Sequence, residues 1–180
     1  NFNADFVSII CDDEQMVDDM KAYIEVIAPE RKNIVQFYDK PIPLMEYYNV
    51  EKQLKQSFGK HVNIPSSKGA YLVIEHTEAL HVVDVNSGNN ISSGGAGNKD
   101  HALNVNKMAA TEIARQLRLR DMGGIIVIDF IDMINADHRR DLYEHLKKEM
   151  SRDKARHKIL PPSKFGLIQL TRQRTRPENI

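Results

Sequence analysis

Three side chains that could bind a divalent cation stand at the ends of apolar runs in the sequence. Asp84 and Asn86 lie in HVVDVNSG, and Asp129 ends the run GGIIVID. Residues two apart in an extended strand point to the same side, so Asp84 and Asn86 would project together. A carboxylate at a position where the pattern predicts a buried Val or Ile is costly to desolvate unless it is paired or bound to a metal. Two such positions at strand ends therefore predict one site.

The chemistry that two carboxylates support is metal-assisted hydrolysis of a phosphodiester. Mg²⁺ binds one or two carboxylates plus waters, so Asp84 and Asp129 would suffice to hold it. The ion can polarise a phosphodiester oxygen and lower the pKa of a bound water, whose attack would leave a 5′-phosphate and a 3′-hydroxyl. Asp132, just beyond Asp129, is either a further metal ligand or the cap of the next helix, and both interpretations stay open. His76 and His81 have no partner at metal-ligand spacing, so surface positions are expected for both.

Regular elements must bring the acidic side chains together. Alternating apolar residues predict strands at 71–75 and 79–85 joined by a tight turn, and hence a hairpin. The helix predicted at 101–121 would bury a stripe of residues four apart, and the apolar run IIVIDF after it is typical of a strand covered on both faces. A helix between two strands indicates an α/β fold. The polar, Gly-rich segment 87–100 predicts a mobile loop beside Asp84.

Periodicity predicts further elements on both sides of this region. Amphipathic helices are expected at 13–27, 44–58 and 135–152, with short strands at 33–38 and after Pro161. Five apolar residues are expected to share one face of the first helix: Met16, Met20, Tyr23, Ile24 and Ile27.

Basic residues gather in the C-terminal half, although the formal net charge is zero. Residues 1–30 contain eight acids with Lys21 as the one base, whereas residues 138–176 contain twelve Lys and Arg against four acids. The second region is the candidate surface for a polyanion, with two solvated surfaces of opposite sign as the alternative. Cations on the polar flank of the helix at 101–121, and alternate arginines forming a basic ledge on the last strand, could contact a nucleic-acid backbone. They are Lys107, Arg115, Arg118, Arg172, Arg174 and Arg176.

Length and composition exclude several classes of protein. The 180 residues can form one or two domains, and 41% hydrophobic with 28% charged residues is ordinary for a soluble globular protein. No apolar run approaches the ~20 residues that span a bilayer, and no signal-peptide pattern opens the chain, so a cytoplasmic location is expected. The single cysteine, Cys11, excludes an intrachain disulfide. Without an initiator Met, the chain is expected to be a fragment of a longer protein.

Three blocks of the sequence closely resemble the catalytic domain of the ribonuclease E/G family, bacterial endoribonucleases that process ribosomal RNA precursors and degrade messenger RNA. The blocks are HVVDVNSG, NKMAATEIARQLRLRDMGGIIVIDFIDM and KFGLIQLTRQRTRP. The middle block is long, continuous and of mixed composition, and the resemblance extends over the whole chain, more weakly before about residue 60. It implies an α/β fold in which residues 1–60 belong to an RNase H-like structural subdomain and residues 61–180 form a DNase I-like catalytic subdomain.

The resemblance also implies roles for single residues. Asp84 and Asp129 match the family's magnesium ligands, and Asn86 matches an asparagine that helps to position the attacked phosphate or water. Arg156, in DKAR, matches an arginine that assists recognition of the 5′-monophosphate of RNA. The implied substrate is single-stranded RNA, and the implied cofactor is Mg²⁺.

Several parts of the complete family members do not occur in this sequence. They are an S1 RNA-binding domain, most of the 5′-phosphate sensor and a Cys-Pro-x-Cys zinc link, so zinc and a homo-oligomer are expected of the full-length form. Two alternatives therefore stay open. The chain could be a folded but inactive scaffold or weak RNA-binding module. It could also be another metal-dependent phosphoesterase, because a DNase I-like arrangement serves several substrates.

Overall fold

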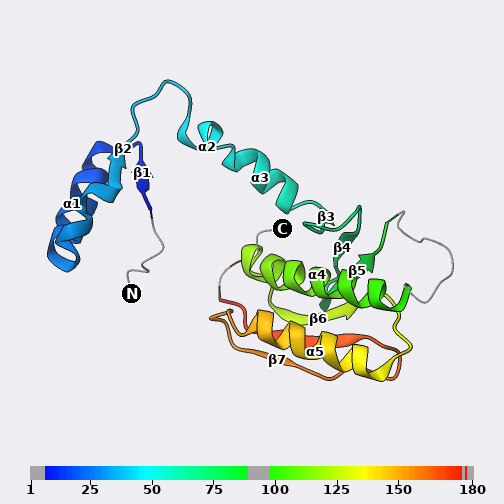
Figure 1. Ribbon diagram of the computed structural model, residues 1–180. Coiled ribbons are helices and arrows are strands. Elements are labelled where there is room, and N and C mark those ends of the chain that lie inside the picture. The colour runs from blue at the N-terminus through cyan, green and yellow to red at the C-terminus, as the bar shows by residue number, and fades with distance from the viewer. Residues whose placement is uncertain (1–6, 89–97, 176, 178–180) are drawn as a thin grey trace. The chain divides into compact units, whose positions relative to one another are not determined.

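The computed structural model describes residues 7–88, 98–175 and 177 (Figure 1). The chain divides into two compact units, Asn1–Lys55 and Gln56–Ile180. This division lies close to the predicted boundary at residue 60, while the assignment of each unit to a named subdomain stays a prediction. Of the helices that the structure describes, none has the length and the apolar character that crossing a membrane requires.

The first unit is built around one helix. Its elements are β1 Ile9–Cys11, α1 Glu14–Ile27, the 3₁₀ helix η1 Pro29–Ile34, β2 Val35–Phe37 and α2 Leu44–Tyr47. Strands β1 and β2 pair in parallel, and the Oδ1 atom of Asp13 caps α1 by accepting a hydrogen bond from Met16 N at 2.7 Å. The predicted helix at 13–27 and strand at 33–38 are therefore confirmed as elements, with slightly shorter bounds.

The buried stripe of α1 is narrower than the sequence pattern predicts. Val17 and Ile24 are its buried residues, while Met16, Tyr23 and Ile27 are exposed. Two strands of three residues each cover only part of an amphipathic helix, so these three apolar side chains lie at the surface.

The single helix predicted at 44–58 is interrupted. Helix α2 ends at Tyr47 and α3, Val50–Ser57, begins after Asn49, whose φ of 57° lies in the left-handed region. Asn adopts this conformation more readily than most residues, because its short polar side chain can form local hydrogen bonds. The prediction was wrong here because a helical period in the apolar residues does not reveal one left-handed residue.

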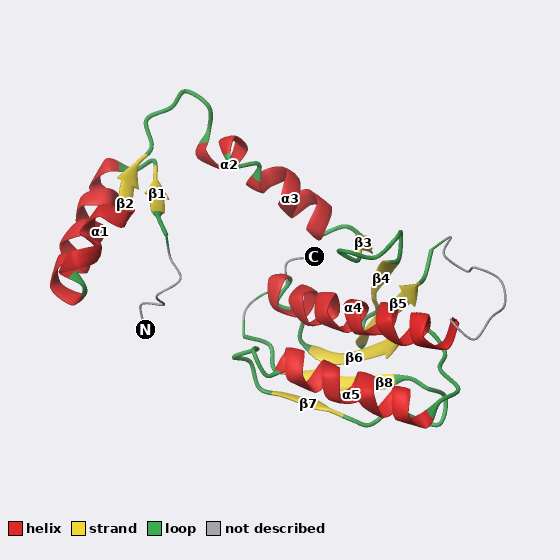
Figure 2. Cartoon of the chain, viewed as in Figure 1, coloured by secondary structure: helices red, strands yellow, loops and turns green. Residues whose placement is uncertain are grey.

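The second unit is a six-stranded mixed sheet with two helices (Figure 2). The strands are β3 His61–Asn63, β4 Tyr71–His76, β5 Leu80–Asn86, β6 Gly124–Asp129, β7 His157–Ile159 and β8 Ile168–Arg172. They lie in the order β3-β4-β5-β6-β8-β7, and among the described strands of this sheet β5 and β6 form the one parallel pair. Helix α4, Asn98–Leu119, connects that pair, and α5, Ala136–Met150, follows β6. The α/β class and the β4–β5 hairpin are confirmed, whereas β3 and β7 were not predicted.

Both helices pack on the same face of the sheet. Alternate residues of β5 and β6, such as Val83, Val85, Ile126 and Ile128, form one core with α4 and α5. The predicted stripe of α4 is buried throughout: Val105, Ala109, Ile113 and Leu117. The expectation that β6 is covered on both faces is wrong, because Ile125 on the opposite face is 49% exposed. An apolar run alone does not reveal which face a helix covers.

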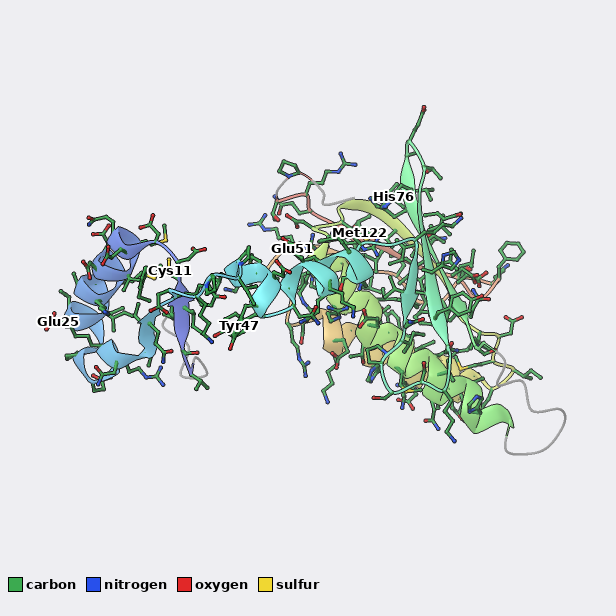
Figure 3. The ribbon with its side chains drawn as sticks, turned by 90° about the horizontal axis from the view of Figure 1, so that it is seen from above. Cys11, Glu25, Tyr47, Glu51, His76 and Met122 are labelled. Carbon is green, nitrogen blue, oxygen red and sulfur yellow. The ribbon has the colours of Figure 1, made fainter. Side chains whose placement is uncertain are left out.

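A pair of histidines closes the β4–β5 hairpin, and Figure 3 labels the first of them, His76. His76 and His81 are register partners, and their Nδ1 atoms lie 2.6 Å apart. The Nε2 atom of His81 also lies 3.0 Å from the carbonyl oxygen of Gly123, and His81 is 5% exposed. The predicted surface position is therefore wrong for His81, which links β5 to the start of β6.

Arg172, at the end of β8, is buried in a hydrogen-bond network. Its Nη1 donates to Asp121 Oδ1 at 2.7 Å and to Met122 O at 3.0 Å, and its Nε donates to Asp153 Oδ2 at 2.7 Å. Burial opposes ionisation of Asp153, but the hydrogen bond and charge of Arg172 hold the pKa of Asp153 below its usual value. The predicted basic ledge is wrong at this position, because alternation along β8 turns Arg172 toward the core.

Arg172→Leu should destabilise the second unit by about 3–5 kcal/mol, because the change leaves two buried carboxylates without their cation. The depressed pKa of Asp153 means that this contribution is lost as the pH falls through that pKa, so the two proteins should converge in acid. Denaturant unfolding followed by circular dichroism measures the difference. Lys158→Leu, at an exposed position of β7, is the control. Equal stability of the two variants at neutral pH would contradict the structural role of Arg172.

Candidate metal centre

Asp84 and Asp129 are direct neighbours across the parallel strands β5 and β6. The register places His81 opposite Ile126 and Asp84 opposite Asp129. Both aspartates are exposed, and strand alternation puts them on the face that α4 and α5 leave open. Neighbouring strands lie about 4.8 Å apart, so the two carboxylates share one patch of the sheet surface.

Asn86 follows Asp84 on the same face of β5. Its Nδ2 atom donates a hydrogen bond to Asp84 Oδ2 at 2.7 Å, which restricts rotation of that carboxylate. Asp84 Oδ1 and the amide oxygen of Asn86 keep their acceptor capacity. Two carboxylates and one amide oxygen on one patch form the oxygen-rich donor set that Mg²⁺ prefers.

Negative charge concentrates at this patch. Partial burial raises the pKa of Asp129 above its usual value, and the charges of Asp84 and Asp132 raise the pKa further. Like charges in one place favour the binding of a proton or of a cation. Within the described part of the chain, no group of three or more His, Cys, Asp or Glu side chains is arranged to hold a metal ion. The pair of Asp84 and Asp129 suits an ion that takes two protein carboxylates and keeps several waters, as Mg²⁺ does.

The structure excludes one of the two interpretations of Asp132. Asn135 is the N-cap of α5, and its Oδ1 accepts a hydrogen bond from Asp137 N at 2.8 Å. Asp132 lies earlier in the exposed loop after β6, so its assignment as the helix cap is wrong. Its role as a further metal ligand stays a prediction, and the described residues do not group Asp132 with Asp84 and Asp129 as a three-ligand site.

One positioning residue was missed from the sequence. Asn106, on α4, is 0% exposed, and its amide makes two hydrogen bonds with the backbone of Ile131. Asn106 Nδ2 donates to Ile131 O at 2.8 Å, and Asn106 Oδ1 accepts from Ile131 N at 3.0 Å. This pair of bonds fixes the chain just beyond Asp129. In the sequence, the one indication of this role is that a polar residue directly follows Val105 in the predicted helix. That indication does not reveal that the partner is Ile131.

The basic residues predicted on α4 belong to the helical side of the sheet, opposite the carboxylate face. Lys107 Nζ lies 2.6 Å from Asp141 Oδ2, and Arg115 donates two hydrogen bonds, of 2.7 and 2.9 Å, to buried Glu112. Arg118 Nη1 lies 3.5 Å from a backbone carbonyl oxygen of α5. The structure therefore does not bring these three cations to the carboxylate pair.

Arg156 lies at a second place on the carboxylate face. It is exposed and lines a hollow of about 460 Å³ together with Lys158 of β7 and Ile125 of β6. Ile125 and Asp129 share one face of β6, and the four residue steps from one to the other correspond to about 13 Å of strand. Arg156 and the acidic patch thus lie near opposite ends of the same strand.

The remaining C-terminal arginines differ in their surroundings. Arg174 is exposed and packs on Gly123, where an added Cβ would come within 2.4 Å of Arg174 Cγ. Arg172 is buried as described above, and Arg176 lies outside the described residues. Residues 89–97, most of the loop predicted beside Asp84, also lie outside them.

Comparison with known proteins shows the family to which this sequence is similar. The sequence model described as "Ribonuclease E/G family" matches residues 1–175. The "Ribonuclease E/G-like protein, chloroplastic" of Arabidopsis thaliana is 40% identical over 176 residues, which cover 98% of this chain and 17% of the relative. For the ribonuclease E of Escherichia coli (strain K12) the identity is 38% over 174 residues, with coverage of 96% and 16%.

The ribonuclease G of Salmonella typhimurium (strain SL1344) is 40% identical over 148 residues, which cover 82% of this chain and 29% of the relative. The chain therefore spans less than a third of the length of each of these three relatives.

In the metal-free protein, Asp84→Asn should lower the pKa of Asp129, because it removes the larger of the two like-charge effects on that carboxyl. The raised pKa also means that the metal-free fold loses stability as the pH rises through the titration of Asp129. Carboxyl NMR titration measures the pKa, and denaturant unfolding at several pH values measures the change in stability. Asp141→Asn, whose carboxylate pairs with Lys107, serves as the control. If the pKa of Asp129 is unchanged in Asp84→Asn, the two carboxylates do not share a site.

Proposed function

Because the chain belongs to the ribonuclease E/G family, we propose that it forms the catalytic part of a magnesium-dependent endoribonuclease acting on single-stranded RNA. The observation that carries this proposal is the in-register pair of Asp84 and Asp129 on β5 and β6. Both carboxylates lie on a face of the sheet that an RNA phosphate can reach, and their oxygens suit a hydrated divalent ion.

Each residue of the patch has a distinct part in the proposed reaction. Asp84 and Asp129 would hold the ion, and Asn86 keeps Asp84 in a fixed orientation through its 2.7 Å hydrogen bond. When bound, Mg²⁺ supplies a Lewis acid and a water of lowered pKa. The second hydrogen on Asn86 Nδ2 can donate to a phosphate oxygen or to the attacking water. Asn106 holds the loop after Asp129 through Ile131.

Attack of water on phosphorus, with loss of the 3′ oxygen and transfer of a proton to it, would leave a 3′-hydroxyl on one product and a 5′-phosphate on the other. Processing of ribosomal RNA precursors and decay of messenger RNA, in the cytoplasm, are the proposed settings. One relative, from Arabidopsis thaliana, is described as chloroplastic. A homo-oligomer is part of the same proposal, and a zinc link within it would need ligands other than Cys11, the single cysteine of the chain.

Arg156 is the proposed contact for a 5′-monophosphate. It shares an open hollow with Lys158 on the carboxylate face, and guanidinium–phosphate hydrogen bonds are strong because both partners are charged. Arg156→Ala should reduce the preference of the complete protein for 5′-monophosphorylated over 5′-hydroxyl RNA. Equal losses on the two substrates would assign Arg156 a general role instead.

The other predicted cations are proposed contacts for the RNA backbone away from the scissile bond. Lys107, Arg115 and Arg118 are on the helical side, and Arg174 is beside Gly123, so none of them would orient the attacked phosphate. Their contribution would be to affinity, and it should weaken as salt is added, because phosphate binding releases counterions.

The decisive test compares Asp84→Asn and Asp129→Asn with the unmodified complete protein. Each change should lower the rate of cleavage of single-stranded RNA by at least about 100-fold, because it removes one charge from the ligand pair of the metal. RNA affinity in EDTA and the circular dichroism spectrum should stay unchanged. Asp141→Asn, an exposed carboxylate on α5, should cleave normally and serves as the control.

Other outcomes would select the alternatives. Normal cleavage by both variants at limiting Mg²⁺ would refute the metal assignment. RNA binding without cleavage by the complete protein would support a non-catalytic RNA-binding module. Equal cleavage of DNA or of small phosphate esters would support a broader metal-dependent phosphoesterase.

A further inference from the structure

A cavity of about 660 Å³ opens directly beyond Asp129. Its walls come from the loop after β6, from the first turns of α5 and from the turn between β7 and β8. Phe130, which follows Asp129, lines it, and so does Ile168, the register partner of Ile128. Because β8 runs antiparallel to β6, the turn that precedes β8 lies at the same end of the strands as Asp129, with Phe130 and Ile168 on the helix-covered side of the sheet and Asp129 on the open side. The volume is within the range of about 300–1,000 Å³ that is typical of ligand pockets.

An exposed aromatic side chain stands at this cavity on a well-defined turn. Phe165 lines the cavity and is 88% exposed. The turn is closed by hydrogen bonds from Ser163 N to Leu167 O at 2.9 Å and from Gly166 N to Ser163 O at 3.0 Å. Phe165 N donates to Ser163 Oγ at 3.2 Å, and Gly166 has a φ of 83°, which favours glycine. The phenyl ring is therefore presented to solvent by a backbone that is already ordered.

Cations outnumber acids in the cavity wall. Arg139, Arg140 and Lys164 line it, and Asp132 is the one acidic residue among the lining side chains that the structure describes. Arg139 Nη1 donates to Ile134 O at 2.9 Å and so holds the loop after β6. Arg140 and Lys164 are exposed, and neither forms an ion pair with another described residue. Both side chains are therefore available to bind an anion.

We propose that this cavity receives the base of a nucleotide next to the scissile phosphate, with the base stacked on Phe165 and the adjoining phosphates near Lys164 and Arg140. The proposal rests on the proposed RNA cleavage at Asp84 and Asp129. Stacking on an exposed aromatic ring beside cations is how proteins bind unpaired nucleotides. An apolar partner protein fits less well, because docking it here would desolvate two unpaired charges.

Stacking predicts a base-dependent loss of affinity at Phe165. In EDTA, where cleavage is blocked, Phe165→Ala in the complete protein should weaken binding of a labelled single-stranded oligonucleotide by roughly 10-fold or more. The side chain is 88% exposed, so its removal should not disturb folding. Ile134→Ala, at a position that is 89% exposed and does not line the cavity, is the matched control and should bind normally.

An abasic nucleotide moved stepwise along the oligonucleotide locates the base. At one position, the abasic substitution should weaken binding by the unmodified protein. With that oligonucleotide, Phe165→Ala should cause no further loss of affinity. Cleavage mapping in Mg²⁺ should place that position beside the broken bond. Lys164→Ala should reduce the slope of log affinity against log salt by about 0.7, the value for one phosphate of a single strand, whereas Lys148→Ala should not.

The outcomes separate this inference from the proposed function. Normal cleavage dependent on Asp84 and Asp129, together with unchanged binding by Phe165→Ala, would refute the base cavity and leave the proposed function standing. The base cavity would also be refuted if the loss of affinity from Phe165→Ala added to the loss from the abasic substitution at every position. Absence of cleavage in the unmodified protein, with the Phe165-dependent binding of one base intact, would refute the proposed function and support the base cavity.

Discussion

The parallel register of β5 and β6 is the constraint on which the candidate site depends. It places Asp84 opposite Asp129, and a shift of one residue would turn one of the carboxylates toward the core. Parallel neighbours need a crossover connection, and here α4 provides it. Because α4 and α5 both pack on one face, the carboxylate pair is left on the other. The acidic patch is thus a consequence of backbone pairing more than of local sequence.

Partial burial is the largest cause of the raised pKa of Asp129, and repulsion from the charges of Asp84 and Asp132 raises that pKa further. The surrounding contacts keep the backbone from relaxing that repulsion. Asn106 holds Ile131 just beyond Asp129, and Asn86 fixes the carboxylate of Asp84. Arg172 joins the end of β8 to the loops that follow α4 and α5. A divalent cation at the patch would remove the repulsion that these contacts sustain.

Much of this arrangement could be predicted from periodicity and from carboxylates that interrupt apolar strands. The hairpin, α4 and its buried stripe follow from such local patterns. What local patterns missed depends on contacts distant in sequence: the burial of Arg172 between Asp121 and Asp153, and the contact of His81 with Gly123. The open face beside Ile125 was missed for the same reason, since one strand does not reveal on which side its helices lie.

The most direct test of the shared site is a titration of Mn²⁺, as a paramagnetic substitute for Mg²⁺, into the isotope-labelled protein. Broadening of backbone amide signals should begin together at residues 84–86 and 129–132, on two strands joined by the whole length of α4. It should disappear from both segments in Asp84→Asn, because one ion serves both carboxylates. Broadening that begins on the acidic helix α1, or that persists at residues 129–132 in Asp84→Asn, would contradict one metal centre built across β5 and β6.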